Sequence, residues 1–185
     1  MILFDPELER NAAPQQIKRM RSEGAQKSQT SNWNDQLPTA RTLERFLREA
    51  QGAVRLRGAV TVLLTTDGEI RRLNREFRGK DMATDVLSFP ASEMAESEAG
   101  DLAISVATAH RQAMSCGHAL RTELKVLILH GLLHLAGYDH ETDTGQMAKR
   151  ERALRERLRL PLGLIERVEG ETTKPAKKTA GGGRL

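Results

Sequence analysis

Three of the five histidines lie within one short segment, HGLLHLAGYDH, which runs from His130 to His140. On a helix, His130 and His134 stand one turn apart on the same face, so two imidazole nitrogens can converge on one ion at about 2.0–2.1 Å. Gly137 occupies the position where a glycine commonly adopts the left-handed conformation and turns the chain back after a helix. This turn would bring His140 to the same ion as a third ligand.

Three protein ligands leave the fourth position of a metal ion open for water, and zinc lowers the pKa of such a water to about 7. We therefore expect one divalent ion, Zn²⁺ in the first instance, in a site suited to hydrolysis. An all-imidazole site also accepts nickel or another borderline ion. A purely structural zinc is the alternative, with Cys116, Asp139 or Asp143 completing the coordination sphere. For Cys116, the more ordinary interpretation is a small buried hydrophobic residue.

The spacing of the three histidines and the glycine is like that of the metzincin subset of zinc proteases. However, Gly131 stands where proteases of the HExxH type carry their catalytic glutamate. The absence of this base argues against peptide hydrolysis. The two remaining histidines, His110 and His118, lie outside the segment, and we interpret both as ordinary surface or helix-end residues.

A basic stretch, RRLNREFRGK, runs from Arg71 to Lys80 and contains five cations and one anion. Charge runs of this kind are usually solvated faces, and this interpretation suits Arg71 and Arg72. Arg78 differs in position, because it lies where a predicted helix gives way to Gly79 and a loop that leads into a core strand. From there a guanidinium could reach a cleft and bind a phosphate through two parallel hydrogen bonds.

Short apolar runs bounded by turn residues predict the strands that would position these side chains. We expect core strands at residues 59–64, 85–89 and 101–105, with an acidic surface loop at 91–99. The first residues, MILF, predict an additional edge strand within residues 1–10.

Helical periodicity and capping residues predict the helices. Thr42 is the expected cap of a helix that extends to about Gln51, and Asp67 of a helix that carries Ile70, Leu73 and Phe77. Further helices are expected at residues 106–115, 120–136 and 144–159, and the second of these has one apolar stripe with the histidine pair beside it.

Strands and helices interleave, which favours an α/β (α+β) fold: a single domain with a small mixed four-stranded sheet packed by about five helices. The metal site would lie at the end of the central helix. Residues 39–169 form the predicted catalytic domain. Residues 11–38 are interpreted as a loop or weakly helical insertion, and residues 170–185 as a disordered basic tail.

Composition limits the class of protein. The 185 residues fit one domain of ordinary size, and an aromatic content of 3% requires a largely aliphatic core. No stretch approaches the roughly 20 apolar residues of a membrane span, and the N-terminus does not resemble a signal peptide, so we expect a cytoplasmic protein without a membrane partner. A net charge of +4 permits an anionic partner without requiring one.

Two segments together resemble one known family. LNREFRGKDMATDVLSFP, residues 73–90, and HGLLHLAGYDH are similar to the signature stretches of the YbeY endoribonucleases, the bacterial rRNA maturation factors. GDLAIS, residues 100–105, matches a third stretch. The resemblance covers about residues 39–165. The chain differs from this family in the insertion at residues 11–38 and in the basic tail.

The resemblance implies a zinc-dependent, single-strand-specific endoribonuclease that acts in rRNA processing, notably 16S rRNA 3′ end maturation, and in ribosome quality control. It implies rRNA on the small ribosomal subunit as the partner, together with ribosome-associated proteins. The family's metal ligands correspond to His130, His134 and His140, and its functionally important arginine corresponds to Arg78.

The mechanistic hypothesis is that a metal-activated water attacks the scissile phosphate, or that zinc polarises it, while Arg78 stabilises the developing negative charge. Asp139 is a candidate to orient a ligand imidazole through a hydrogen bond, although a surface or capping role suits it equally. Two alternatives stay open. The protein would be a ribosome assembly factor with a mainly structural zinc, or a metal-dependent hydrolase of another substrate.

Overall fold

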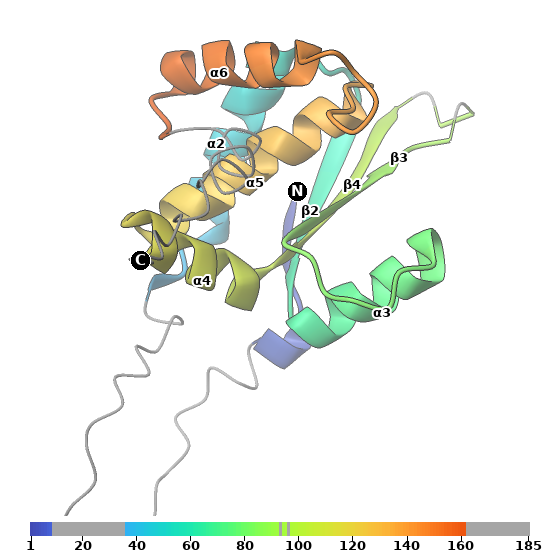
Figure 1. Ribbon diagram of the computed structural model, residues 1–185, viewed down its shortest axis with the longest axis vertical. Helices are drawn as coiled ribbons and strands as arrows, with labels where there is room; N and C mark the ends of the chain where they lie inside the picture. The colour runs from blue at the N-terminus through green and yellow to red at the C-terminus, as the bar shows by residue number, and fades with distance from the viewer. Residues whose placement is uncertain (9–35, 93, 96, 162–185) are drawn as a thin grey trace, which may run out of the picture.

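The apolar runs assemble into one mixed sheet with helices on both faces (Figure 1). The computed structural model describes residues 1–8, 36–92, 94–95 and 97–161. The strands are β1 (Ile2–Phe4), β2 (Ala59–Thr65), β3 (Val86–Pro90) and β4 (Glu98–Ser105), and their order in the sheet is β1-β2-β4-β3. β1, β2 and β4 run parallel, whereas β3 runs antiparallel to β4. The predicted α/β fold with a small mixed four-stranded sheet is confirmed.

The hairpin between β3 and β4 is longer than the sequence predicts. Pro90 pairs with Gly100, and Glu98 pairs with Ala59 of β2, so β4 begins three residues before the predicted strand. The prediction of a loop over residues 91–99 is therefore wrong for its last two residues. The first residue of β4 pairs with Ala59 of β2, which is distant in sequence, so the local pattern does not reveal where β4 begins.

The helices are α2 (Ala40–Val54), α3 (Asp67–Arg78), α4 (Val106–Cys116), α5 (Leu120–Leu135) and α6 (Gln146–Leu158). Two of the predicted caps are wrong. Thr39 rather than Thr42 caps α2, and Thr66 rather than Asp67 caps α3 through a hydrogen bond from the Glu69 N–H at 3.2 Å. The Asp67 carboxylate instead accepts hydrogen bonds from side chains of β4 and α4, and so joins α3 to them.

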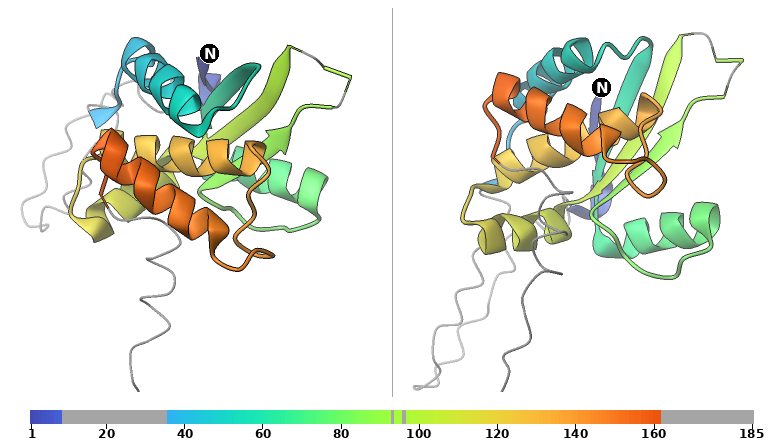
Figure 2. Two further views of the ribbon diagram at one scale, coloured as in Figure 1. Left: turned by 90° about the horizontal axis from the view of Figure 1, so that it is seen from above. Right: turned by 45° about the horizontal axis from the view of Figure 1, so that its top comes forward.

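Helices cover both faces of the sheet (Figures 1 and 2), and the two faces bury different side chains. Leu102 and Ile104 of β4 belong to the main core, which α2, α5 and α6 complete. Ala103, which alternates with them, packs with Ile70 of α3 and Leu87 of β3 in a small second core. Because successive side chains of a strand point to opposite faces, α3 lies on the face of the sheet opposite α5.

α5 is buried on all sides from Val126 to Leu133, so the prediction of a single apolar stripe is wrong. Its buried residues run from Leu120 to Leu135 and include His130 and Gly131. A helix with apolar residues all round is typical of a core position. Tertiary packing causes this burial, because the sheet, α2, α4 and α6 all contact α5.

Several predictions concern residues outside the described ranges. The insertion at 11–38 lies almost entirely outside them, and the basic tail at 170–185 lies wholly outside, so both stay predictions. Within the described ranges, none of the helices combines the length and the apolar character that crossing a membrane requires.

Gly131 allows α5 to approach the sheet closely. A Cβ at this position would lie 2.7 Å from Cδ2 of Leu102, which is 1% exposed. The residue therefore faces the interface between helix and sheet rather than solvent. A larger side chain would enter the main core, where Leu102 has no room to move aside.

We predict that Gly131→Glu destabilises the fold by roughly 3 kcal/mol or more, because a charged side chain would be forced into a packed apolar interface. The measurement is the free energy of unfolding by urea. Gly52→Glu is the matched control, since a Cβ at this α2 position meets nothing within 4 Å. Equal stability of the two variants would contradict the packing role of Gly131.

Candidate metal centre

The three histidines of the segment meet at one point. Their ring centroids lie 4.8, 5.2 and 5.3 Å apart, and each ring offers a nitrogen within 4.8 Å of the others. The Nε2 atoms of His130 and His134 are 3.1 Å apart. A tetrahedral ion with bonds of 2.0–2.1 Å would separate its nitrogen ligands by about 3.3 Å. The geometry therefore fits one ion held by His130, His134 and His140.

A tight turn brings His140 back to the helix. Gly137 has a φ angle of 87°, as the sequence predicts, and its N–H donates to the His134 carbonyl at 3.0 Å. The next N–H, of Tyr138, donates to the Leu133 carbonyl at 3.0 Å. These two bonds satisfy carbonyls at the end of α5 and fix the direction of the chain that leads to His140.

The histidines lie in an open cleft with a volume of about 930 Å³. Burial decreases across the group: His130 is buried, His134 is half-buried and His140 is exposed. Alternate residues of the edge strand β3 line the cleft, together with residues from α3 and from the turn after α5. These residues are Arg78, Lys80, Thr84, Asp85, Val86, Ser88, Pro90, Gly137, Tyr138, Asp139 and Glu141.

The ring of His134 favours the neutral form that a metal requires. Burial, followed by the neighbouring His130, His140 and Arg78, lowers the pKa of His134 from about 6.5 to about 4, against an opposing effect of Asp139. Its imidazole is therefore neutral at pH 7 and keeps a lone pair for an ion. The influence of Arg78 shows that this guanidinium and the histidines share one electrostatic environment.

The cations of the basic stretch have different roles. Arg71 binds Asp81 through two hydrogen bonds of 2.8 Å, and Arg72 pairs with Glu69 and with Glu76. Both lie on an exposed surface of α3, as predicted. Arg78, the last residue of α3, lines the cleft instead, and no carboxylate among the described residues pairs with it.

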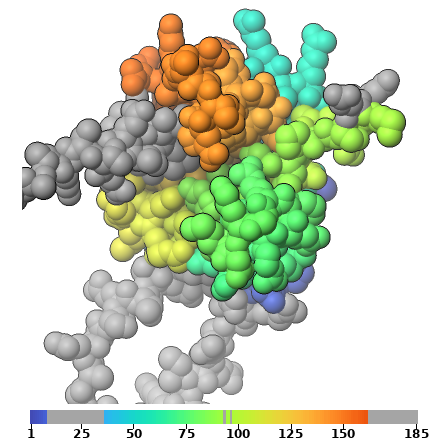
Figure 3. All heavy atoms as spheres, turned by 45° about the vertical axis from the view of Figure 1, so that its right-hand side comes forward, coloured from blue at the N-terminus to red at the C-terminus, as the bar shows by residue number. Residues whose placement is uncertain are grey.

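The loop after Arg78 is anchored to α3. Asn74 is 3% exposed, and its side-chain amide donates to the Met82 carbonyl at 2.8 Å. The pair between Arg71 and Asp81 holds the same loop from outside. These contacts fix the path from Arg78 through Lys80 into β3, and so direct both cations towards the cleft. Figure 3 shows α3 (green) and the segment around α6 (orange) on one face of the molecule.

Asp139 and Asp143 organise the turn between α5 and α6. The Asp139 carboxylate accepts hydrogen bonds from the Glu141 N–H and the Thr142 hydroxyl, each at 3.0 Å, which lower its pKa. Asp143 accepts from the N–H groups of Gly145 and Met147, each at 2.7 Å, at the start of α6. Both acids therefore have a capping role. A hydrogen bond from the N–H of a ligand imidazole to Asp139 stays a prediction.

A carboxylate that the sequence pattern does not predict lies behind the histidines. Oε2 of Glu151, on α6, lies 3.1 Å from Nδ1 of His130. The predicted helix contains many charged residues, and nothing in their order alone distinguishes Glu151. The sequence does contain one indication that Glu151 is buried. It lies at helical spacing between two apolar residues, and Met147, Glu151 and Leu154 share a buried face of α6.

The other candidate residues lie elsewhere. Cys116 is exposed as the last residue of α4, so its interpretation as a buried hydrophobic residue is wrong. The helix ends there at Gly117 and buries Val106, Ala109 and Ala113 instead. His110 lies on α4, and His118 contacts Glu123 at the junction of α4 and α5. Within the described residues, the metal-ligating group comprises three histidines alone.

The fold and the site together define an α/β protein with a three-histidine group in an open cleft that arginine and lysine also line. Residues 22–159 match the family described as endoribonuclease YbeY. Endoribonuclease YbeY of Koribacter versatilis is 55% identical over 139 residues, which cover 75% of this chain and 88% of that protein. The corresponding protein of Solibacter usitatus is 51% identical over 127 residues, which cover 69% and 84%.

A solution structure of TM1509 from Thermotoga maritima is 27% identical, with a TM-score of 0.47, and the match covers 77% of this chain and 94% of that one. The family match extends over most of the described domain, and the matched residues include the histidines and Arg78. The chain belongs to the YbeY endoribonuclease family.

We predict that His134→Ala lowers zinc affinity by at least about a hundredfold, because the variant removes one of three ligands. The measurement is competition with a chromophoric chelator, using protein first stripped of metal. Cys116→Ala is the control, and it should bind zinc as the unmodified chain does. A loss of zinc in the Cys116 variant, with binding intact in the His134 variant, would contradict this ligand set.

Proposed function

We propose that this protein is a metal-dependent endoribonuclease that cleaves single-stranded RNA. The observation that carries the proposal is the shared cleft, in which His130, His134 and His140 face the same space as Arg78 and Lys80. A metal site beside cations that no carboxylate of the described residues pairs with suits a phosphodiester substrate. The relatives named endoribonuclease YbeY support the same reaction class.

The three histidines, Arg78 and Lys80 each have a role in this reaction. The three histidines hold one divalent ion, for which zinc is the proposed identity. When bound, the ion supplies Lewis-acid chemistry, either by activating water or by polarising the phosphate. Arg78 binds a non-bridging phosphate oxygen and stabilises the negative charge that develops during cleavage. Lys80 adds a second, less directional positive charge.

The open cleft favours a catalytic ion over a structural one. A structural zinc has four protein ligands, whereas the described residues offer three at this point, and the group borders solvent through His140. Gly131, which lies against Leu102, leaves the cleft without the glutamate that HExxH peptidases use. These observations favour RNA cleavage over an assembly factor with a structural zinc and over peptide hydrolysis.

Phe77, which precedes Arg78 in α3 but is not among the residues that line the cleft, offers an exposed aromatic ring that suits a single-stranded substrate. Phe77 is 61% exposed, and its ring packs edge-to-face on Phe89 of β3 with centroids 5.2 Å apart. The contact holds one edge of the ring and leaves its remaining surface accessible. An unpaired base can stack on such a ring, whereas the bases of a duplex already stack on one another.

The remaining features of the proposal rest on family membership. They are an rRNA substrate on the small ribosomal subunit, with 16S rRNA 3′ end maturation as the main reaction, a role in ribosome quality control, and a cytoplasmic location. The net charge of +4 and the cations of the cleft are compatible with an RNA partner.

Arg78→Gln should lower the rate of RNA cleavage about a hundredfold, because one group that stabilises the developing charge is lost. The assay is single-turnover cleavage of a single-stranded RNA oligonucleotide, with the zinc content measured on the same preparation. Zinc content should stay unchanged. Arg72→Gln is the matched control, since this arginine also lies on α3 but pairs with Glu69 and Glu76. Equal rates in the two variants would remove Arg78 from the reaction.

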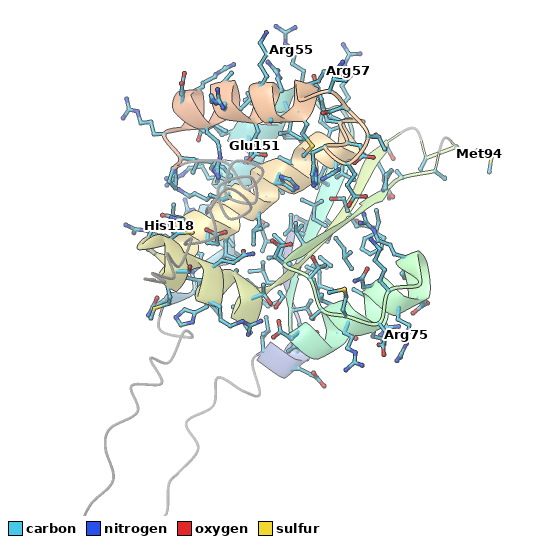
Figure 4. All side chains as sticks on the ribbon, viewed as in Figure 1. Arg55, Arg57, Arg75, Met94, His118 and Glu151 are labelled. Atoms are coloured by element: carbon cyan, nitrogen blue, oxygen red, sulfur yellow. The ribbon has the colours of Figure 1, made fainter. Side chains whose placement is uncertain are left out.

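Phe77→Ala should weaken the binding of a short single-stranded RNA about tenfold, which corresponds to the loss of one stacked base. Phe77→Trp should keep or increase the affinity, because the larger ring also stacks. The measurement is fluorescence anisotropy of a labelled oligonucleotide. Met94→Ala, at the exposed tip of the β3–β4 hairpin in Figure 4, is the control. Unchanged affinity after Phe77→Ala would contradict the stacking role.

A further inference from the structure

A buried carboxylate from α6 contacts the most buried histidine of the group. Oε2 of Glu151 lies 3.1 Å from Nδ1 of His130, and the two residues are 1% and 6% exposed. Figure 4 shows Glu151 in the space between α6 and α5. The two residues are 21 positions apart in sequence, so the contact depends on how α6 packs on α5.

This contact determines which nitrogen of His130 carries a proton. A carboxylate accepts hydrogen bonds and an imidazole N–H donates them, so the 3.1 Å contact is made by an Nδ1–H that points at Oε2 of Glu151. The other nitrogen, Nε2, then has a free lone pair, and it is the atom that lies 3.1 Å from Nε2 of His134. The hydrogen bond therefore selects the tautomer that a metal ion needs and holds the ring plane in the required orientation.

The surroundings keep the side chain of Glu151 in place. Nε of Arg155, one turn further along α6, lies 3.2 Å from Oε1 of Glu151, and this arginine is 3% exposed. Met147 and Leu154 on the same helix belong to the main core. Asp143 caps the start of α6 three residues after His140, so the helix that carries Glu151 is joined directly to the turn that carries the third histidine.

We propose that Glu151 is a positioning residue of the metal centre, which holds His130 in the tautomer with a proton on Nδ1 and directs Nε2 towards the ion. The inference rests on the proposed function for its effect on metal affinity. Its effect on the tautomer does not need the metal. α6 is then part of the metal centre, although it contributes no ligand.

A second pair of glutamate and histidine, partly buried, provides a control that separates a positioning role from a purely structural one. Glu123, which is 0% exposed, contacts Nε2 of His118 at the start of α5. Figure 4 places His118 at the junction of α4 and α5, distant from Glu151. Neither partner belongs to the three-histidine group. Glu123→Gln therefore changes a comparable buried contact without changing the metal site.

The first test is the tautomer of His130 in metal-free protein, measured by two-bond ¹H–¹⁵N correlation in the imidazole ring. The unmodified chain should show a protonated Nδ1 and a bare Nε2. Glu151→Gln retains a side-chain oxygen that can accept the Nδ1 proton and should largely keep this state, whereas Glu151→Ala should show a mixture. A protonated Nε2 in the unmodified chain would overturn the proposal without reference to any variant.

The second test is zinc affinity, measured by chelator competition. Glu151→Ala should weaken binding about 10–100-fold, Glu151→Gln by a smaller factor, and Glu123→Gln should leave it unchanged. Wild-type affinity in both Glu151 variants would overturn the proposal, as would an equal loss in the Glu123 variant. If Glu151→Ala does not fold, the zinc affinity of Glu151→Gln and the His130 tautomer of the unmodified chain test the proposal. If the unmodified chain binds no zinc, the proposed function fails, and the tautomer still tests the contact.

Discussion

The structure depends on one constraint: three imidazoles must be held at a single point before any ligand arrives. The burial of α5 satisfies this requirement. His130 and His134 are fixed because their helix is surrounded by apolar side chains, and the close approach at Gly131 seats that helix on the sheet. A turn after α5 brings His140 to the other two histidines, and carbonyls of α5 accept the backbone hydrogen bonds of this turn. Little conformational entropy is then left to lose when an ion binds, which favours a preorganised site.

The elements around α5 contribute different side chains to the site. α6 supplies the carboxylate that contacts His130 from behind, whereas the open side faces the cleft beside β3. Arg78 reaches the same cleft from α3, on the opposite face of the sheet. In the described part of the chain β3 is an edge strand, and it borders the proposed RNA site. An RNA strand lying across this edge would meet the metal ligands from one layer and the phosphate-binding arginine from another.

Local patterns predicted most of what lies close together in sequence. The spacing of His130 and His134, and the glycine that turns His140 towards them, depend on helix geometry and turn chemistry alone, so the sequence predicts both. The alternation of strands and helices likewise predicted the mixed sheet. The errors arise where the outcome depends on distant residues. Asp67 bonds to β4 and α4 rather than capping its own helix, and Glu151 becomes significant only because α6 packs on α5.

The central claim is that one ion, held by the three histidines, is required for RNA cleavage. The most direct test is to strip the protein of metal and titrate zinc back, while both bound zinc and the cleavage of a single-stranded RNA are measured. The account predicts no cleavage without metal and a rate that rises in proportion to bound zinc, reaching its maximum at one equivalent. Full activity in the metal-free protein, or a rate independent of the zinc bound, would contradict it.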